Sequence, residues 1–411
     1  MQDRQLYQQI LGITSPWSVE HVELDLKQGE VRVFLEHAAD AAWACPECGR
    51  TCPLHDHDPV RAWRHLDTCQ YRTVLHSAVP RTKCPEHGVK TARVPWAEPY
   101  SRFTALFERL VIDWLLAASQ SAVAERMGLS WDEVHGIMDR AVKRGLAHRQ
   151  ADEVPRLGVD EKAFRKGHRY VTIVTDLDRG RVLYVAKDRK QTSLDGFWKT
   201  LTDKQRDGIE AVAMDMCDAY VASVKEHLPQ AEDKIVFDKF HVAKHLSEAV
   251  DLVRRAENKA LRAEGDDRLV GTKYQWLRNA DNHSETQWRN FKALRDSDLK
   301  TARAWALKEQ AMWMWNYVHP GTARRHFKWW YRWATHSRLP PMIAAAKMLA
   351  ARLPNILTYM KHGITNATSE SINSKIQWVK YTARGFRNFD NFVTAIYFHC
   401  GGLELAPSAM K

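Results

Sequence analysis

Glu370 is the only acid between Gln310 and Phe389, a stretch that contains twelve Lys and Arg residues. A surface that binds phosphate favours positive charge, because each neutralised phosphate releases a counterion and adds affinity. Such a surface tolerates a carboxylate best where a metal ion cancels its charge. Glu370 is therefore a candidate metal ligand at a nucleic-acid surface. The alternative is a solvated glutamate on a helix surface.

Two aspartates precede it in a segment that reads as an α/β sheet. From residue 157 to residue 238 the pattern is β-β-β-α-β-α-β. Three antiparallel strands followed by crossover-linked strands are the RNase H-like order, with helices on both faces. Asp160 lies in the first of these strands, and Asp215 ends the fourth, its neighbour in such a sheet. Both carboxylates are therefore expected at one edge.

Glu370 completes a set of three acids. Ile372, Ile376 and Val379 predict the apolar face of a helix, and Glu370 lies on the other face. Three converging carboxylates suit two Mg²⁺ ions, or Mn²⁺, in an in-line displacement at phosphorus. For the two aspartates the alternative is a strand-end acid that caps a helix. Three nearby acids also compete for the role: Asp176, Asp178 and, as the main rival to Asp215, Asp218.

A second kind of chemistry is indicated near the N-terminus. Two short CPE motifs, Cys45–Cys48 and Cys84–His87, are each followed by Gly, and we call them knuckles. Two such knuckles supply four tetrahedral ligands for Zn²⁺, here Cys45, Cys48, Cys84 and His87. Free thiols in a small core are the alternative. Three spare donors could replace one of the four: Cys52, His55 and Cys69.

The elements around the knuckles read as strands and then as helices. Segments 19–26 and 29–37 predict a hairpin, and 64–84 alternates as strands do. Ser101 is expected to cap a helix that reaches Ala118. A second helix (121–126), a turn at Gly128 and a third helix, capped by Ser130 and Glu133 and reaching about residue 143, then give a helix-turn-helix. The alternative is an ordinary helical hairpin. The expected groove-facing residues are Trp131, Asp132, His135 and Arg140.

Residues 246–359 read as helical throughout. Eight of the sixteen tryptophans lie between Trp276 and Trp333, interleaved with cations. Aromatic rings beside cations suit stacking on unpaired bases, although for most of these rings a tryptophan-rich core is the better interpretation. The expected DNA contacts are Arg324, Arg325, Lys328, Trp329, Trp330, Arg332 and Trp333, together with Lys375, Lys380 and Arg384 beside Glu370.

Taken together, these motifs resemble the DDE transposases of bacterial insertion sequences, in the ISL-three group. The resemblance covers nearly the whole chain and is carried by GVDEKAFRKGHRYVTIVTDL, VAMDMCDAY, FDKFHVAKHL and TNATSESINSKIQWVKYTARGFRNFDNF. It implies that Asp160, Asp215 and Glu370 form the catalytic triad. It also implies that Asp238 and His241 form a DxxH element, which supports the active site or holds the scissile strand. One departure is His87, where the family often has Cys at a longer spacing, so the fourth zinc ligand stays open.

The expected fold class is multidomain α+β: a small β-rich zinc-binding domain, a helix-turn-helix domain, and an RNase H-like α/β catalytic core with a large all-helical insertion. The expected boundaries are 1–98 for the zinc-binding domain, 99–150 for the helix-turn-helix, 151–245 and 360–411 for the two parts of the core, and 246–359 for the insertion.

The charge balance favours a polyanionic partner, since the formal net charge is +11 and the pI is about 9.2. No apolar run approaches the roughly 18–20 residues of a membrane span, and the N-terminus lacks an apolar signal region. We expect a cytoplasmic, nucleoid-associated bacterial protein that binds the double-stranded inverted repeats of its element and target DNA. It would act as a homodimer or larger assembly in Mg²⁺-dependent cut-and-paste transposition. The alternatives are a sequence-specific DNA-binding regulator with an inactive core and an RNase H-like nuclease.

Overall fold

The computed structural model describes residues 3–149, 152–165, 169–364 and 367–407. The expected boundary at residues 150 and 151, and parts of two quoted motifs at 166–168 and 365–366, lie outside these ranges. The chain forms two compact units, Met1–Arg149 with Leu403–Lys411, and Gln150–Gly402, and each is described by itself. Every helix among the described residues is too short or too polar to cross a bilayer.

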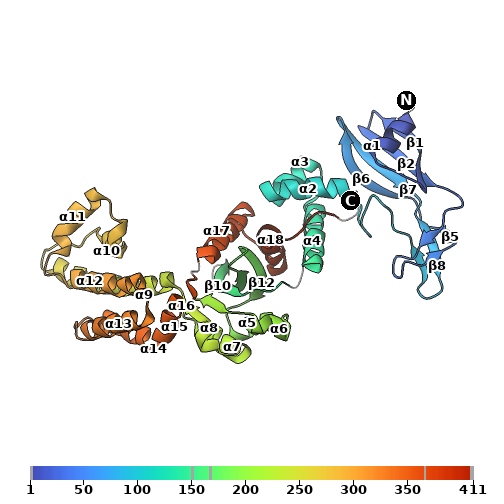
Figure 1. Cartoon of the computed structure of the whole chain (residues 1–411). Coiled ribbons are helices and arrows are strands. Elements are labelled where there is room, and N and C mark those ends of the chain that lie inside the picture. The colour runs from blue at the N-terminus through green and yellow to red at the C-terminus, as the bar shows by residue number, and fades with distance from the viewer. Residues whose placement is uncertain (1–2, 150–151, 166–168, 365–366, 408–411) are drawn as a thin grey trace. The chain divides into compact units, whose positions relative to one another are not determined.

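The first unit is built on a four-stranded sheet, drawn in blue in Figure 1. Its strands are β1 (Trp17–Asp25), β2 (Glu30–His37), β6 (Arg61–Thr68) and β7 (Tyr71–Ser77), in the order β1-β2-β7-β6. The predicted hairpin is confirmed, since β1 and β2 pair antiparallel. Alternation along β2 buries Val31, Val33 and Leu35, and α1 (Asp3–Ile10) packs against β1.

Two smaller sheets carry the knuckles. β3 (Trp43–Ala44) pairs with β4 (Thr51–Cys52), while β5 (Leu54–His57), β8 (Pro80–Cys84) and β9 (Gly88–Thr91) form a second ribbon. The first knuckle lies in the β3–β4 loop and the second in the β8–β9 turn. Gly49 and Gly88 close them at φ of 73° and 71°, a conformation that glycine adopts without steric cost.

Three helices complete the first unit: α2 (Ala105–Ala117), α3 (Gln120–Met127) and α4 (Trp131–His148). Gly128 ends α3 at φ 63°, and Ser130 and Glu133 form the capping box of α4. Both features were predicted and are confirmed. The predicted end of α4 was wrong, because the helix runs on to His148, with the buried Arg144 of its last turns paired to Glu98 at 2.6 Å.

The predicted N-cap of α2 was also wrong. Thr104 caps the helix, because its side chain accepts a hydrogen bond from the backbone N–H of Phe107. The hydroxyl of Ser101 instead donates to Glu108, at 2.7 Å, and therefore holds the approach to the helix in place.

A five-stranded mixed sheet forms the base of the second unit. Its strands are β10 (Arg156–Arg165), β11 (Arg169–Asp176), β12 (Arg181–Lys187), β13 (Ala211–Met214) and β14 (Ile235–Phe237). The order is β12-β11-β10-β13-β14. The β12–β11–β10 pairs are antiparallel, whereas β13 pairs parallel to β10 and to β14. The predicted succession of three antiparallel strands and then crossover strands is confirmed.

Helices cover both faces of this sheet. Leu157 and Val174 pack toward α5 (Gln191–Trp198) and α7 (Asp218–His227). Val171 and Ile173 point to the other face, toward α17 (Ala367–Thr382) and α18 (Phe389–Cys400). The predicted apolar face of α17 is buried as expected. Two short helices, α6 (Asp203–Asp207) and α8 (Ala231–Lys234), complete the connections.

The segment between β14 and α17 is helical, as predicted. Its longest helix, α9 (Lys239–Ala263), runs through residue 246 without a break and leads from the sheet toward α12 (Figure 1). One apolar core joins the sheet to this segment. The remaining helices are α10 (Lys273–Leu277), η1 (Ala280–Asn282), α11 (Glu285–Arg295), α12 (Lys300–Met312), η2 (Trp313–Asn316), α13 (Pro320–Thr335), α14 (Pro340–Ala351), α15 (Leu353–Leu357) and α16 (Tyr359–His362).

Candidate active site and metal centre

Asp160 and Asp215 lie next to each other where β10 and β13 pair. Val159 is the partner of Met214 in the parallel register; Asp160 is the next residue of β10, and Asp215 directly follows the end of β13. Neighbouring strands are about 4.8 Å apart, and residues in matched register point to the same face. The structure therefore brings the two carboxylates together, as the strand order led us to expect.

The surroundings of this pair disfavour two negative charges. Burial raises the pKa of Asp160, and the charge of Asp215 raises it further, against the N–H of Glu161 (2.7 Å) and the positive charge of His241. Burial also raises the pKa of Asp215, against His241 and the N–H of Cys217 (3.1 Å). Paired buried carboxylates are stabilised by a cation between them, and oxygen ligands suit Mg²⁺. The donor set therefore fits a divalent ion of that kind.

Helix α17 approaches the same part of the sheet. Asn373 donates its amide N–H to Asp160 Oδ2 at 2.5 Å, and the hydroxyls of Ser369 and Thr175 are 3.0 Å apart. Gly158 permits this approach, since a Cβ there would lie 2.3 Å from the Ser369 hydroxyl. Glu370 sits between the two anchored residues and shares a helix face with Asn373. Its exposed carboxylate forms no hydrogen bond or ion pair with the described residues, and the ligand oxygens of Asp160, Asp215 and Glu370 do not all lie within 4.8 Å of one another.

The predicted DxxH pair lies at the junction of β14 and α9. Asp238 is 5% exposed, and its backbone N–H donates to the carbonyl of Met214, at 3.3 Å, beside Asp215. His241 lies in the first turn of α9, close enough for its charge to lower the pKa of both aspartates. His241 thus lies near the two aspartates, and Asp238 is buried at the end of the neighbouring strand.

The three rival acids are each held by arginine. Asp176 is fully buried and pairs with Arg181 at 3.1 Å. Asp178 pairs with Arg156, and Asp218, whose side chain is 88% exposed, pairs with Arg352. Each of these three carboxylates therefore has an arginine as its ion-pair partner.

Sequence reasoning missed one ion pair at this site. Glu161 pairs with Arg189 at 3.2 Å, and the guanidinium of Arg189 lies 4.7 Å from the ring centre of Tyr170. The charges of Glu161 and Arg189 both act on the pKa of Asp215, in opposite directions. No pattern in the sequence linked the two, because Glu161 lies on β10 and Arg189 follows β12, and these strands flank β11 in the sheet.

The two knuckles form one cluster in the first unit. The ligand atoms of Cys45, Cys48, Cys84 and His87 all lie within 4.8 Å of one another. The Cys48 and Cys84 sulfurs are 3.7 Å apart, near the roughly 3.8 Å that tetrahedral bonds of about 2.3 Å to zinc would give. Burial raises the pKa of Cys84, but backbone N–H groups and His87 outweigh it and bring that pKa to about 6, which favours the thiolate. The residues present therefore fit Zn²⁺.

The spare donors named from the sequence lie outside this four-atom group. Cys52 is buried nearby, and its thiol donates to the Arg50 carbonyl at 3.5 Å. His55 and Cys69 are exposed.

Helix α4 presents part of the expected groove-facing set. Trp131 and Asp132 are exposed in its first turn, and the His135 ring stacks on Trp131 with centroids 5.0 Å apart. Arg140 is a correction, because its guanidinium pairs with the buried carboxylate of Glu108 at 2.5 Å. That ion pair joins α4 to α2, and it directs the Arg140 guanidinium toward α2 and away from a DNA groove.

One further DNA-contact expectation was wrong. Trp330 is 1% exposed, and its indole N–H donates to the Leu307 carbonyl at 2.8 Å, so it belongs to the helical core. Lys380 is partly exposed and donates to the Ala163 carbonyl at 2.5 Å, so it links α17 to β10, and its contact with DNA stays a prediction. The other residues of these two sets are exposed or partly exposed: Arg324, Arg325, Lys328, Trp329, Arg332, Trp333, Lys375 and Arg384.

Comparison with known proteins gives one consistent answer along the chain. The family model described as "Transposase" matches residues 157–396, "Helix-turn-helix domain of transposase family ISL3" matches 92–142, and "zinc-finger of transposase IS204/IS1001/IS1096/IS1165" matches 41–87. The transposase for insertion sequence element IS1001 of Bordetella parapertussis is 30% identical over 96% of this chain and 98% of that protein. The transposase for element IS1557 of Mycobacterium tuberculosis is 28% identical over 94% of this chain and 93% of that protein.

Proposed function

Because the chain belongs to the ISL3 family of transposases, we propose that it is a DDE-type enzyme that moves its own insertion sequence by cut-and-paste. The observation that carries this proposal is that the strand register places the partly buried carboxylates of Asp160 and Asp215 side by side, where a divalent cation would offset their repulsion. Glu370, on a helix tied to Asp160 through Asn373, would be the third ligand.

We assign the sheet of the second unit to the RNase H-like class. Its strand order and the two faces of helices support that assignment. The domain limits proposed from the sequence are kept, except that α9 makes the border near residue 246 a point within one helix.

The chemistry is two successive displacements at phosphorus. Two Mg²⁺ ions, or Mn²⁺, held by the three carboxylates would activate the attacking oxygen and stabilise the leaving one. Water attacks the phosphodiester at the element's end, and the P–O3′ bond breaks to leave a 3′-hydroxyl and a 5′-phosphate. That hydroxyl then attacks a target phosphodiester and displaces the target's own 3′ oxygen. One phosphodiester bond forms as another breaks, so the step needs no hydrolysis of a nucleoside triphosphate. The N–H groups of Glu161 and Cys217 orient the aspartates, and His241 offsets their charge.

Recognition of the inverted repeats is proposed for the first unit. The Zn²⁺ ligands Cys45, Cys48, Cys84 and His87 would fix the knuckles, and Trp131, Asp132 and His135 would enter the major groove. Lys375 and Arg384 would follow the DNA backbone beside Glu370. Two ends must be cut together, so a homodimer or larger assembly on DNA is proposed, acting at the bacterial nucleoid in the cytoplasm.

The test compares duplexes that carry or lack the element's ends, in the presence of Mg²⁺. Asp160→Ala, Asp215→Ala and Glu370→Ala should each abolish nicking and leave binding of the ends within about twofold. Asp218→Ala is the matched control, because this exposed acid follows the same strand and should keep full activity. Nicking by any of the three variants would remove that residue from the triad. Specific binding without nicking by the wild type would indicate a regulator, and cutting indifferent to sequence would indicate a nuclease.

A further inference from the structure

Helix α13 has two faces of opposite character. Ala323, Phe327, Trp330 and Ala334 are buried in the helical core. The outward face carries cations that form no ion pair with any residue in the described part of the chain, and all of them are exposed: Arg324, Arg325, Lys328 and Arg332. No acid occurs between Gln310 and Ser369 to balance them. This face therefore attracts a polyanion.

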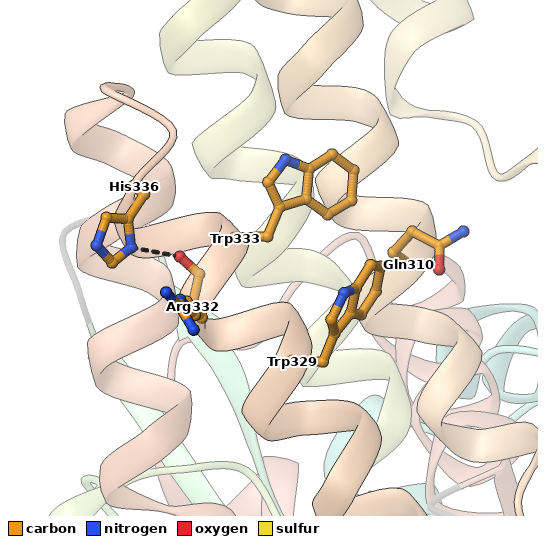
Figure 2. A pocket seen from close by; sticks show the side chains of 5 residues that line it. All are labelled: Gln310, Trp329, Arg332, Trp333 and His336. Atoms are coloured by element: carbon orange, nitrogen blue, oxygen red, sulfur yellow. Dashed lines mark hydrogen bonds between the residues drawn. The ribbon is translucent and has the colours of Figure 1, made fainter.

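An open pocket of about 590 Å³ lies on the same face. It is lined by Trp329, Arg332, Trp333 and His336 of the α13 region and by Gln310 of α12 (Figure 2). The two indoles are one helical turn apart, with centroids at 5.7 Å and planes at 42°. Trp329 is 55% exposed although a tryptophan gains much from burial. An exposed indole next to a partly buried one, beside cations without ion pairs in the described part of the chain, is typical of a binding surface.

Polar groups border the two rings. The Nδ1 of the His336 ring hydrogen-bonds to the Arg332 carbonyl at 2.7 Å, as Figure 2 shows. Its Nε2 forms no hydrogen bond with the described residues and can therefore bind a ligand. The side chain of Gln310 adds an amide that can both donate and accept. The pocket thus combines flat apolar faces with hydrogen-bonding edges and adjacent positive charge.

We propose that this pocket receives an unpaired nucleobase of a DNA strand, stacked on Trp329 and Trp333, with the flanking phosphates on Lys328 and Arg332. Every base has a π-face, so such stacking tolerates any sequence. The unpaired cations favour a nucleic acid over an apolar protein segment or a second copy of this positively charged chain. This proposal rests on the proposed function in one respect, which is that the bound nucleic acid is DNA.

The test uses the full chain and three labelled probes that share one duplex. One probe is blunt, one has a five-nucleotide thymidine overhang, and one has five abasic units in that overhang. Trp329→Ala and Trp333→Ala should weaken binding of the thymidine probe by about 5- to 150-fold, since base–aromatic stacking contributes about 1–3 kcal/mol per base. Binding of the blunt and abasic probes should stay within twofold. Trp313→Ala is the matched control, because Trp313 is also 55% exposed and lies outside the pocket.

Three results would overturn the proposal. They are unchanged binding of the thymidine probe, an equal loss on all three probes, and a change in oligomeric state on Trp329→Ala without a change in overhang binding. Trp329→Phe should restore most of the affinity, which separates stacking from a loss of fold. Because this assay involves no cleavage and no element end, its outcome is independent of whether the chain nicks DNA.

Discussion

Asn373→Ala tests whether α17 positions the carboxylate pair. The change removes the amide N–H that meets Asp160 Oδ2 at 2.5 Å and leaves the buried apolar face of α17 untouched. A hydrogen bond to a charged group contributes about 1.5–3 kcal/mol, so nicking should slow by about 10- to 150-fold if the bond orients the reacting carboxylate. The lost donor had also lowered the pKa of Asp160. That pKa should therefore rise, and the defect should grow as the pH falls.

The measurement is the single-turnover nicking rate between pH 6 and pH 9 at several Mg²⁺ concentrations. Gln377→Ala is the control, since Gln377 is an exposed amide one turn further along the same helix, and its rate should match the wild type. Asn373→Ala should need more Mg²⁺ for half its maximal rate while still binding the ends. A rate within twofold of the wild type at every pH would refute the positioning role.

Two other predictions concern the first unit. Cys45→Ser should release zinc and weaken end binding, whereas Cys69→Ser, an exposed thiol outside the cluster, should keep both; equal zinc content by mass spectrometry would contradict the knuckle assignment. Burial lowers the pKa of His65 to about 4, so the folded state keeps this ring neutral while the unfolded chain takes up a proton near pH 6.5. Its contribution, up to about 3 kcal/mol, is present above pH 6.5 and is lost as the pH falls toward 4. His65→Gln should therefore flatten the fall of Tm over that range, and an unaltered slope would count against this account.

The sequence predicted those features that local rules determine. Glycine and capping residues defined the turn and start of α4, and strand periodicity defined the order from β10 to β14. The adjacency of Asp160 and Asp215 followed from that order, since residues in matched register on neighbouring parallel strands lie side by side.

The errors lay where a distant partner decides the outcome. Trp330 and Trp329 are adjacent and chemically identical, yet α12 buries only the first. Arg140 carries a charge suited to phosphate, but the carboxylate of Glu108, which is remote in sequence, pairs with it. Periodicity gives a helix its faces without saying what lies against each one.

Helix α9 gives the second unit a rigid lever. It is 25 residues long, about 37 Å, with His241 in its first turn beside the aspartates. Farther along it packs against α12 and α14, which in turn pack against α13. A continuous helix bends far less readily than a loop, so α9 fixes the distance between His241 and the helices that pack around Trp329 and Trp333.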